Sequence, residues 1–219
     1  MHVLESVYPS IYSSDHLFFR EELRRVEEAG FRELHVDIQD GVFVPNLSFG
    51  MKVVSGLRKY TAMPFNVHLM VVNPEFYVER LKAVSGIRAV YFYPSSTRYP
   101  SQLITEIARM GAVAGFALNP IEEIAELAYY REAIGGFLVG TGEPDNAQGR
   151  FNSGALQKIR RLREMYGAGP EIVVDGDINA QTLPAARRAG ATRFVVGRAI
   201  FGASDIGAVL SDLEAALVQ

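Results

Sequence analysis

The stretch Glu33-Leu-His-Val-Asp-Ile-Gln-Asp-Gly41 places two side chains that can bind a metal, His35 and Asp37, two residues apart in an apolar run. Side chains at positions i and i+2 of a β-strand point to the same face of the sheet. If the run forms a strand, both groups therefore reach one point near its end. The stretch predicts a strand that delivers metal-binding or acid/base groups to a common site.

Two later apolar runs end in side chains of the same kind, His68 in Phe65-Asn-Val-His-Leu-Met70 and Asp175 in Glu171-Ile-Val-Val-Asp175. A histidine or aspartate at a strand end is, taken alone, more typical of a hydrogen-bonded scaffold or a helix cap. Their joint occurrence in apolar surroundings favours a metal site, because buried ionisable groups are costly unless they are paired or bound to a metal. A mixed nitrogen and oxygen set suits Zn²⁺, Mn²⁺, Fe²⁺ or Co²⁺ better than Ca²⁺ or Mg²⁺.

Composition narrows the class of protein. The chain has 219 residues, 48% of them hydrophobic, which is enough for one large core. A net charge of −3 gives no electrostatic reason to bind nucleic acid or an anionic membrane, and the absence of cysteine excludes disulfides and thiolate metal sites. The first residues lack the features of a signal peptide, and no apolar run approaches the ~20 residues of a membrane span. We expect a soluble cytoplasmic protein.

Short strand-like runs alternate with amphipathic helical segments along the whole chain, and glycines follow several of the helical segments. Eight strand–helix units in about this length predict an α/β fold, a single (β/α)₈ barrel over residues 1–219. An open doubly wound sheet is the alternative, weakened because no G-x-G-x-x-G follows the first strand. The expected strands are Val3–Val7, Glu33–Asp37, Pro64–Met70, Ala89–Tyr93, Ala112–Leu118, Gly136–Gly140, Glu171–Asp175 and Arg193–Val196. The expected helices include Asp15–Ala29, Pro74–Val84, Ser101–Arg109, Ser153–Tyr166 and Thr182–Ala189.

In such barrels the active site lies at the carboxyl ends of the strands. Besides the two histidines and two aspartates, these ends carry Ser10, Tyr93, Asn119, Thr141 and Gly197-Arg198.

Several motifs resemble those of the ribulose-phosphate 3-epimerase family. The most specific are His35-Val-Asp-Ile-Gln-Asp-Gly-Val-Phe-Val-Pro-Asn46 and Asn66-Val-His-Leu-Met-Val-Val-Asn-Pro-Glu75. The others are Ser10 in Tyr-Pro-Ser-Ile, Phe116-Ala-Leu-Asn-Pro120, Val174-Asp-Gly176 and Gly197-Arg-Ala-Ile-Phe-Gly202. They follow one another in the family's order and cover essentially the whole chain.

The resemblance implies a (β/α)₈ barrel that inverts C3 of a pentulose 5-phosphate through an enediolate, using one divalent metal ion. It implies that Asp37 and Asp175 are the acid/base pair on opposite faces of the substrate. It also implies an oligomer of identical chains. By the same resemblance the metal ligands are His35, Asp37, His68 and Asp175, and the substrate-binding residues are Ser10, Gln39, Met70, Gly176, Gly197 and Arg198.

The chain departs from the family's pattern in two regions. Of the methionines that surround the enediolate only Met70 remains, with Gln39 and Gly140 at the other positions. The glycine-rich phosphate loop is replaced by Glu143-Pro-Asp-Asn-Ala-Gln-Gly149, and the paired glycines after the seventh strand are Gly176-Asp177. These carboxylates repel a phosphate. Arg198 either binds phosphate or pairs with Asp177, and the sequence leaves both open.

Three functions are therefore predicted in order of preference. The first is a metal-dependent epimerase of a ketose phosphate of the ribulose 5-phosphate type. The second is an epimerase or isomerase of a ketose without phosphate or with a different anionic tail. The third is a barrel that binds a metal or a sugar without turnover.

Overall fold

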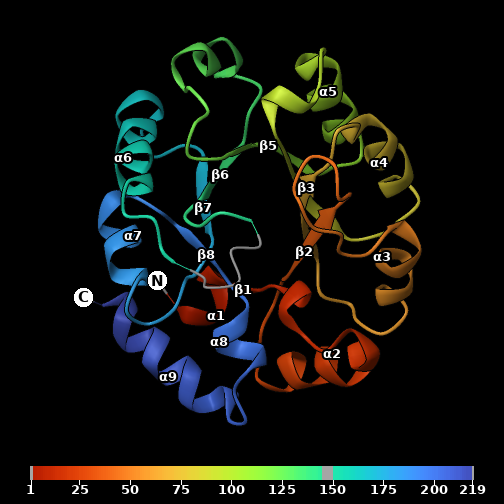
Figure 1. Cartoon of the computed structure of the whole chain (residues 1–219), viewed down its shortest axis with the longest axis vertical. Coiled ribbons are helices and arrows are strands. Elements are labelled where there is room, and N and C mark those ends of the chain that lie inside the picture. Colours follow the sequence, from red (N-terminus) through yellow and green to blue (C-terminus); the bar gives the residue numbers. More distant parts are fainter. Residues whose placement is uncertain (1, 145–149, 219) are drawn as a thin grey trace.

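The apolar runs form eight parallel strands that close into a barrel in the computed structural model, which describes residues 2–144 and 150–218 (Figure 1). Around the sheet the strand order is β1-β8-β7-β6-β5-β4-β3-β2. A parallel bridge between Ser10 and His35 joins the two edges. The predicted single-domain (β/α)₈ barrel is confirmed, and the doubly wound alternative is wrong. The strands are β1 Val7–Pro9, β2 Leu34–Gln39, β3 Phe65–Met70, β4 Ile87–Phe92, β5 Val113–Leu118, β6 Gly136–Gly140, β7 Glu171–Asp175 and β8 Arg193–Val196.

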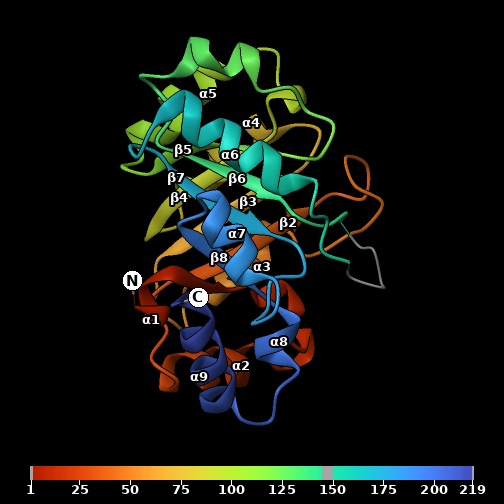
Figure 2. The same ribbon diagram turned by 90° about the vertical axis from the view of Figure 1, so that its left-hand side faces the viewer.

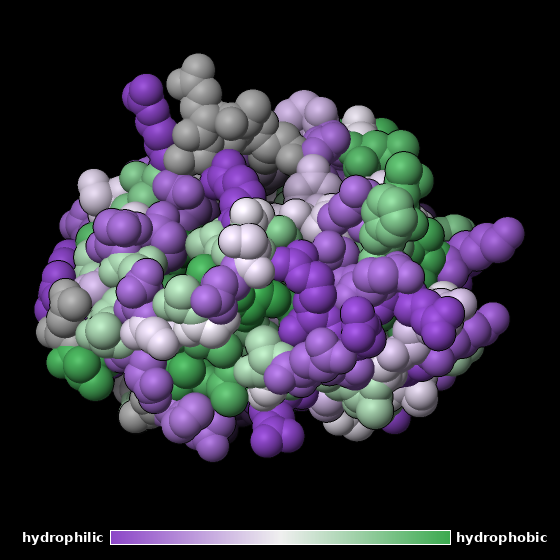
Figure 3. Space-filling view, turned by 90° about the horizontal axis from the view of Figure 1, so that it is seen from below, coloured by the Kyte–Doolittle hydropathy of each residue, from purple (hydrophilic) through white to green (hydrophobic). Residues whose placement is uncertain are grey.

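Helices surround the barrel (Figure 1), and the longer ones, such as α2, α5 and α6, bury hydrophobic residues on one face. On the face that carries α2 and α9, hydrophilic residues surround scattered hydrophobic ones (Figure 3). Within the described residues no helix has both the length and the apolar character needed to cross a membrane. The helices are α1 Val3–Ser6, α2 Phe19–Glu28, α3 Met51–Leu57, α4 Pro74–Leu81, α5 Pro100–Arg109, α6 Ala155–Tyr166, α7 Leu183–Ala189, α8 Arg198–Phe201 and α9 Ile206–Leu217. Short 3₁₀ helices are η1 Ile11–Ser13, η2 His16–Phe18, η3 Pro94–Ser96 and η4 Ala125–Tyr130.

The start of the first strand differs from the prediction of Val3–Val7. Residues Val3–Ser6 form one helical turn, and β1 begins only at Val7. The His2 ring accepts a hydrogen bond from the Leu4 amide at 3.3 Å, and Ser6 Oγ donates to the His2 carbonyl at 2.8 Å. These local side-chain bonds favour a capped turn over an extended chain.

The interior of the barrel is filled by large side chains from alternating strand positions. Tyr91 of β4 is fully buried there, and its ring occupies the space beside two glycines, one in β5 and one in β6. A Cβ atom at Gly115 would lie 2.3 Å from the Tyr91 ring, and one at Gly136 would lie 3.3 Å from it. Glycine in these strands therefore makes room for an aromatic ring in the barrel.

Ion pairs occupy the end of the barrel at which the strands begin. Arg88 donates two hydrogen bonds to Glu171, at 3.0 and 2.8 Å, and its Nε lies 3.2 Å from Glu33. Arg193 lies 3.1 Å from Glu171 and also donates to Tyr8 Oη at 3.0 Å. In (β/α)₈ barrels conserved chemistry at this end serves stability. The groups predicted for function lie at the opposite end, where the strands finish.

Candidate active site

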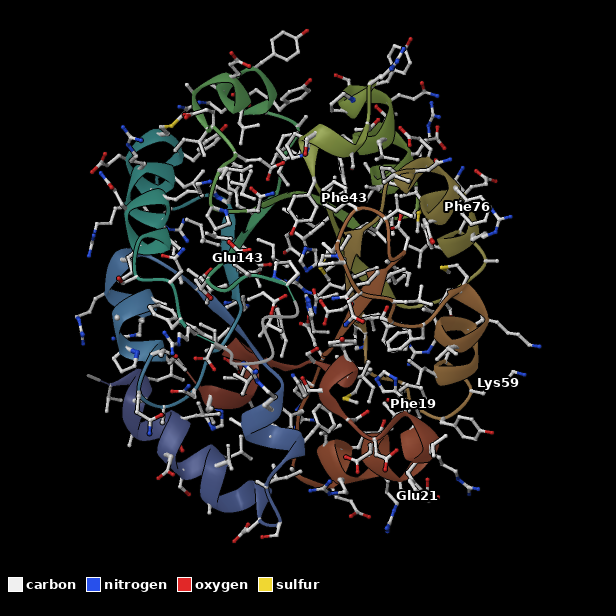
Figure 4. All side chains as sticks on the ribbon, viewed as in Figure 1. Phe19, Glu21, Phe43, Lys59, Phe76 and Glu143 are labelled. Atoms are coloured by element: carbon white, nitrogen blue, oxygen red, sulfur yellow. The ribbon has the colours of Figure 1, made fainter. Side chains whose placement is uncertain are left out.

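A cavity of about 500 Å³ opens at the carboxyl ends of the strands, a size typical of sites for small molecules. In Figure 2 the loop after β2 projects from this end of the barrel, whereas α1 lies toward the other. Figure 4 shows Phe43 and Glu143 over the mouth, while Glu21, Lys59 and Phe76 point outward at the periphery. The cavity is lined by all the predicted site residues but the fully buried His35, namely Ser10, Asp37, Gln39, His68, Met70, Asp175, Gly176, Gly197 and Arg198.

The four predicted ligands converge, with donor atoms that all lie within 4.8 Å of one another. His35 Nε2 lies 3.2 Å from Asp37 Oδ1 and 3.8 Å from Asp175 Oδ2. His68 Nδ1 lies 3.3 Å from Asp37 Oδ1 and 3.2 Å from Asp175 Oδ2. Tetrahedral ligands at zinc-like bond lengths are separated by about 3.4 Å. The donor set and its spacing therefore fit one divalent transition-metal ion.

Asp37 is almost fully buried, and its two oxygens have different neighbours. Oδ1 faces both histidines, whereas Oδ2 accepts a hydrogen bond from Ser10 Oγ at 2.6 Å. Burial raises the pKa of Asp37, but the charges and hydrogen bonds of His35 and His68 outweigh it and hold this pKa well below its usual range. Asp37 is thus ionised, with Oδ2 oriented by Ser10.

His68 uses both ring nitrogens. Burial lowers its pKa, but hydrogen bonds to Asp175 and Asp37 more than compensate and raise it to about 9. On the other side of the ring, His68 Nε2 lies 3.2 Å from Tyr93 Oη. The Tyr93 ring is itself buried and packs on Phe43, with 4.7 Å between centroids. A histidine that binds metal through Nδ1 donates its Nε2 proton to such a partner, which fixes the ring.

Tyr93→Phe keeps the ring against Phe43 but removes the oxygen that holds His68. We expect the affinity for Zn²⁺ to fall about tenfold, because a ligand histidine without its outer partner is oriented less firmly. Competition with a chromogenic chelator measures this affinity. Tyr129→Phe, at a side chain that is 84% exposed, serves as the control. Equal affinities in both variants would show that Tyr93 only fills space.

Gln39 and Met70 stand side by side in the cavity wall, and Gln39 Nε2 lies 3.7 Å from Met70 Sδ. Among the described residues Gln39 Oε1 has no hydrogen-bond partner although it is buried. Where the family's pattern has an apolar methionine, this chain thus has an acceptor at the edge of the cavity.

In the region predicted for phosphate, the structure shows the pairing of Arg198 with Asp177. Arg198 Nη2 donates to Asp177 Oδ1 at 3.1 Å, so the ion pair forms. Glu143 lines the cavity nearby, whereas the predicted repulsion by Asp145 falls in segment 145–149, outside the described residues.

Several lining residues were not predicted because they lie in loops or in the short helix η1 rather than at strand ends. Tyr12 Oη accepts a hydrogen bond from Asn46 Nδ2 across the mouth. Arg150 and Asn179 line the end of the cavity near Arg198. Asn46 stands at the end of the most specific motif, which was the one signal for it in the sequence.

Comparison with known proteins identifies relatives of this chain. Residues 6–201 match the model of the ribulose-phosphate 3 epimerase family. Ribulose-phosphate 3-epimerase of Methanocaldococcus jannaschii is 37% identical over 213 residues, which cover 96% of this chain and 90% of that protein. The cytoplasmic isoform of Oryza sativa subsp. japonica is 36% identical, with coverage of 95% and 92%.

Among solved structures, thiamine phosphate pyrophosphorylase of Pyrococcus furiosus superimposes with a TM-score of 0.64 at 18% identity, covering 98% of this chain and 96% of that one. That likeness concerns the fold alone. The family match and the sequence relatives also bear on activity. They confirm the prediction that this chain is an isomerase of the epimerase class. The chain belongs to the ribulose-phosphate 3-epimerase family.

Proposed function

We propose that this protein is a metal-dependent epimerase that inverts C3 of a ketose phosphate of the ribulose 5-phosphate and xylulose 5-phosphate type. The observation that carries the proposal is the arrangement of Asp37 and Asp175. Each directs one oxygen at the cluster with His35 and His68, and each has a second oxygen beyond those contacts. They come from β2 and β7, which β1 and β8 separate around the barrel.

Inversion at a carbon beside a ketone requires one group to remove the proton and another to return it from the opposite face. Asp37 Oδ2, held by Ser10, is suited to one face. Asp175, whose side chain is 23% exposed, offers Oδ1 to the other face. His35, Asp37, His68 and Asp175 would hold one Zn²⁺, Mn²⁺, Fe²⁺ or Co²⁺ ion. When bound, such an ion supplies positive charge that stabilises the enediolate.

Nuclear magnetic resonance in D₂O tests the proposal. We expect the metal-loaded protein to convert D-ribulose 5-phosphate to D-xylulose 5-phosphate and to introduce deuterium at C3. The absence of exchange with every ketose and ketose phosphate tested would contradict it. Heat-inactivated protein controls for exchange catalysed by buffer or free metal.

A second candidate is an epimerase of a ketose without phosphate. The ion pair between Arg198 and Asp177 favours it, because this guanidinium already has an anionic partner. Rates with D-ribulose and D-ribulose 5-phosphate under the same conditions distinguish the two candidates.

A further inference from the structure

Asp177 directly follows Gly176 at the end of β7 and lines the cavity. Its φ of 54° lies in the left-handed region, and among the described residues it is the only one other than glycine with a positive φ. Its side chain is 26% exposed.

Both oxygens of the Asp177 carboxylate are engaged by donors from other segments. Oδ1 accepts from Arg198 Nη2 at 3.1 Å, and Oδ2 accepts from the Phe151 amide at 3.2 Å. A guanidinium and a backbone N–H are the donors with which proteins bind oxyanions such as phosphate. The carboxylate therefore occupies groups that a substrate's anionic tail would otherwise use.

The formal charges at this end of the cavity leave no surplus for a phosphate dianion. Apart from Asp37 and Asp175 of the cluster, the charged lining residues in the described part of the chain are two positive ones, Arg150 and Arg198, and two negative ones, Glu143 and Asp177. A phosphate bound here has to displace the Asp177 carboxylate from Arg198 or bind beside it against repulsion.

We propose that Asp177 is a specificity-determining residue, an internal anion that competes with the substrate's phosphate for Arg198 and the Phe151 amide. The inference rests on the proposed function and deepens it. Asp177 weakens the binding of phosphorylated ketoses and leaves the binding of uncharged ketoses largely unaffected. As a result, this chain prefers phosphorylated over uncharged ketoses less strongly than it would with an uncharged residue at position 177.

Asp177→Asn tests the inference, because asparagine matches the shape of aspartate and tolerates the left-handed conformation. We expect KM for D-ribulose 5-phosphate to fall by on the order of tenfold, and KM for D-ribulose to change much less. The dissociation constant of inorganic phosphate, measured by calorimetry, should fall to a similar degree. Asp212→Asn, on the exposed surface of α9, makes the same change in net charge and should alter neither constant.

The two hypotheses fail in different ways. If the wild type exchanges no ketose proton, the proposed function fails, whereas the calorimetric comparison still decides the role of Asp177. If Asp177→Asn binds phosphate as the wild type does or more weakly, the inference is overturned, and Asp177 instead holds Arg198 in place for the ligand. Should the asparagine variant fail to fold, Asp177→Gly removes the same charge at a φ that favours glycine.

Discussion

Asp175→Asn is expected to suppress epimerisation strongly while leaving proton exchange with one of the two epimers. The amide cannot accept a proton, so we expect turnover to fall by about 10²- to 10⁴-fold, the usual contribution of a general base. In the proposed mechanism Asp37 is unaffected by this change and can still remove and return the proton on its own face. In D₂O one epimer therefore gains deuterium without inversion, while the other gains none.

The reciprocal variant, Asp37→Asn, should exchange only the other epimer. This complementarity is what two bases on opposite faces require, and loss of fold or of metal would not produce it. Metal content is measured for each variant, since the asparagine oxygen can still act as a ligand. Asp212→Asn controls for net charge. Exchange of both epimers at wild-type rates in either variant would show that the two carboxylates do not form the acid/base pair.

The convergence of the site could be predicted because strand periodicity is encoded locally. His35 and Asp37 share a face through their spacing, and the apolar runs around them identify the strands. The register could not be read from the chain: β2 and β3 pair so that Asp37 stands beside His68. That pairing depends on packing of the whole barrel, since a shift of one residue would turn His68 away from the cluster.

The loops at the mouth were less predictable. The sequence alone could not predict that Arg198 pairs with Asp177. This contact depends on the φ of Asp177 and on where the Phe151 amide lies. Both are set by connections between strands rather than by periodic patterns. The short turn of Val3–Ser6 escaped prediction for a similar reason, since one histidine and one serine stabilise it.

Removal of metal is expected to abolish activity. Dialysis against a strong chelator should lower turnover by on the order of 10²-fold or more, because the negative charge of the enediolate then lacks its main electrostatic stabilisation. Addition of Zn²⁺, Mn²⁺, Fe²⁺ or Co²⁺ should restore activity at one ion per chain, as a cluster of four ligands requires. Full activity in dialysed protein that elemental analysis shows to be free of metal would contradict the proposed mechanism.

His35→Gln tests whether the metal ion that supports activity binds at the cluster of His35, Asp37, His68 and Asp175. His35 is completely buried and its Nε2 faces both aspartates, so its loss should weaken metal binding by about 10²-fold or more. His16→Gln is the matched control, because His16 is exposed and outside the four-residue cluster. Metal affinity and turnover should fall together in His35→Gln, and excess metal should recover part of the turnover. If affinity stays at the wild-type value, the ion that supports activity binds elsewhere, and His35 is not one of its ligands.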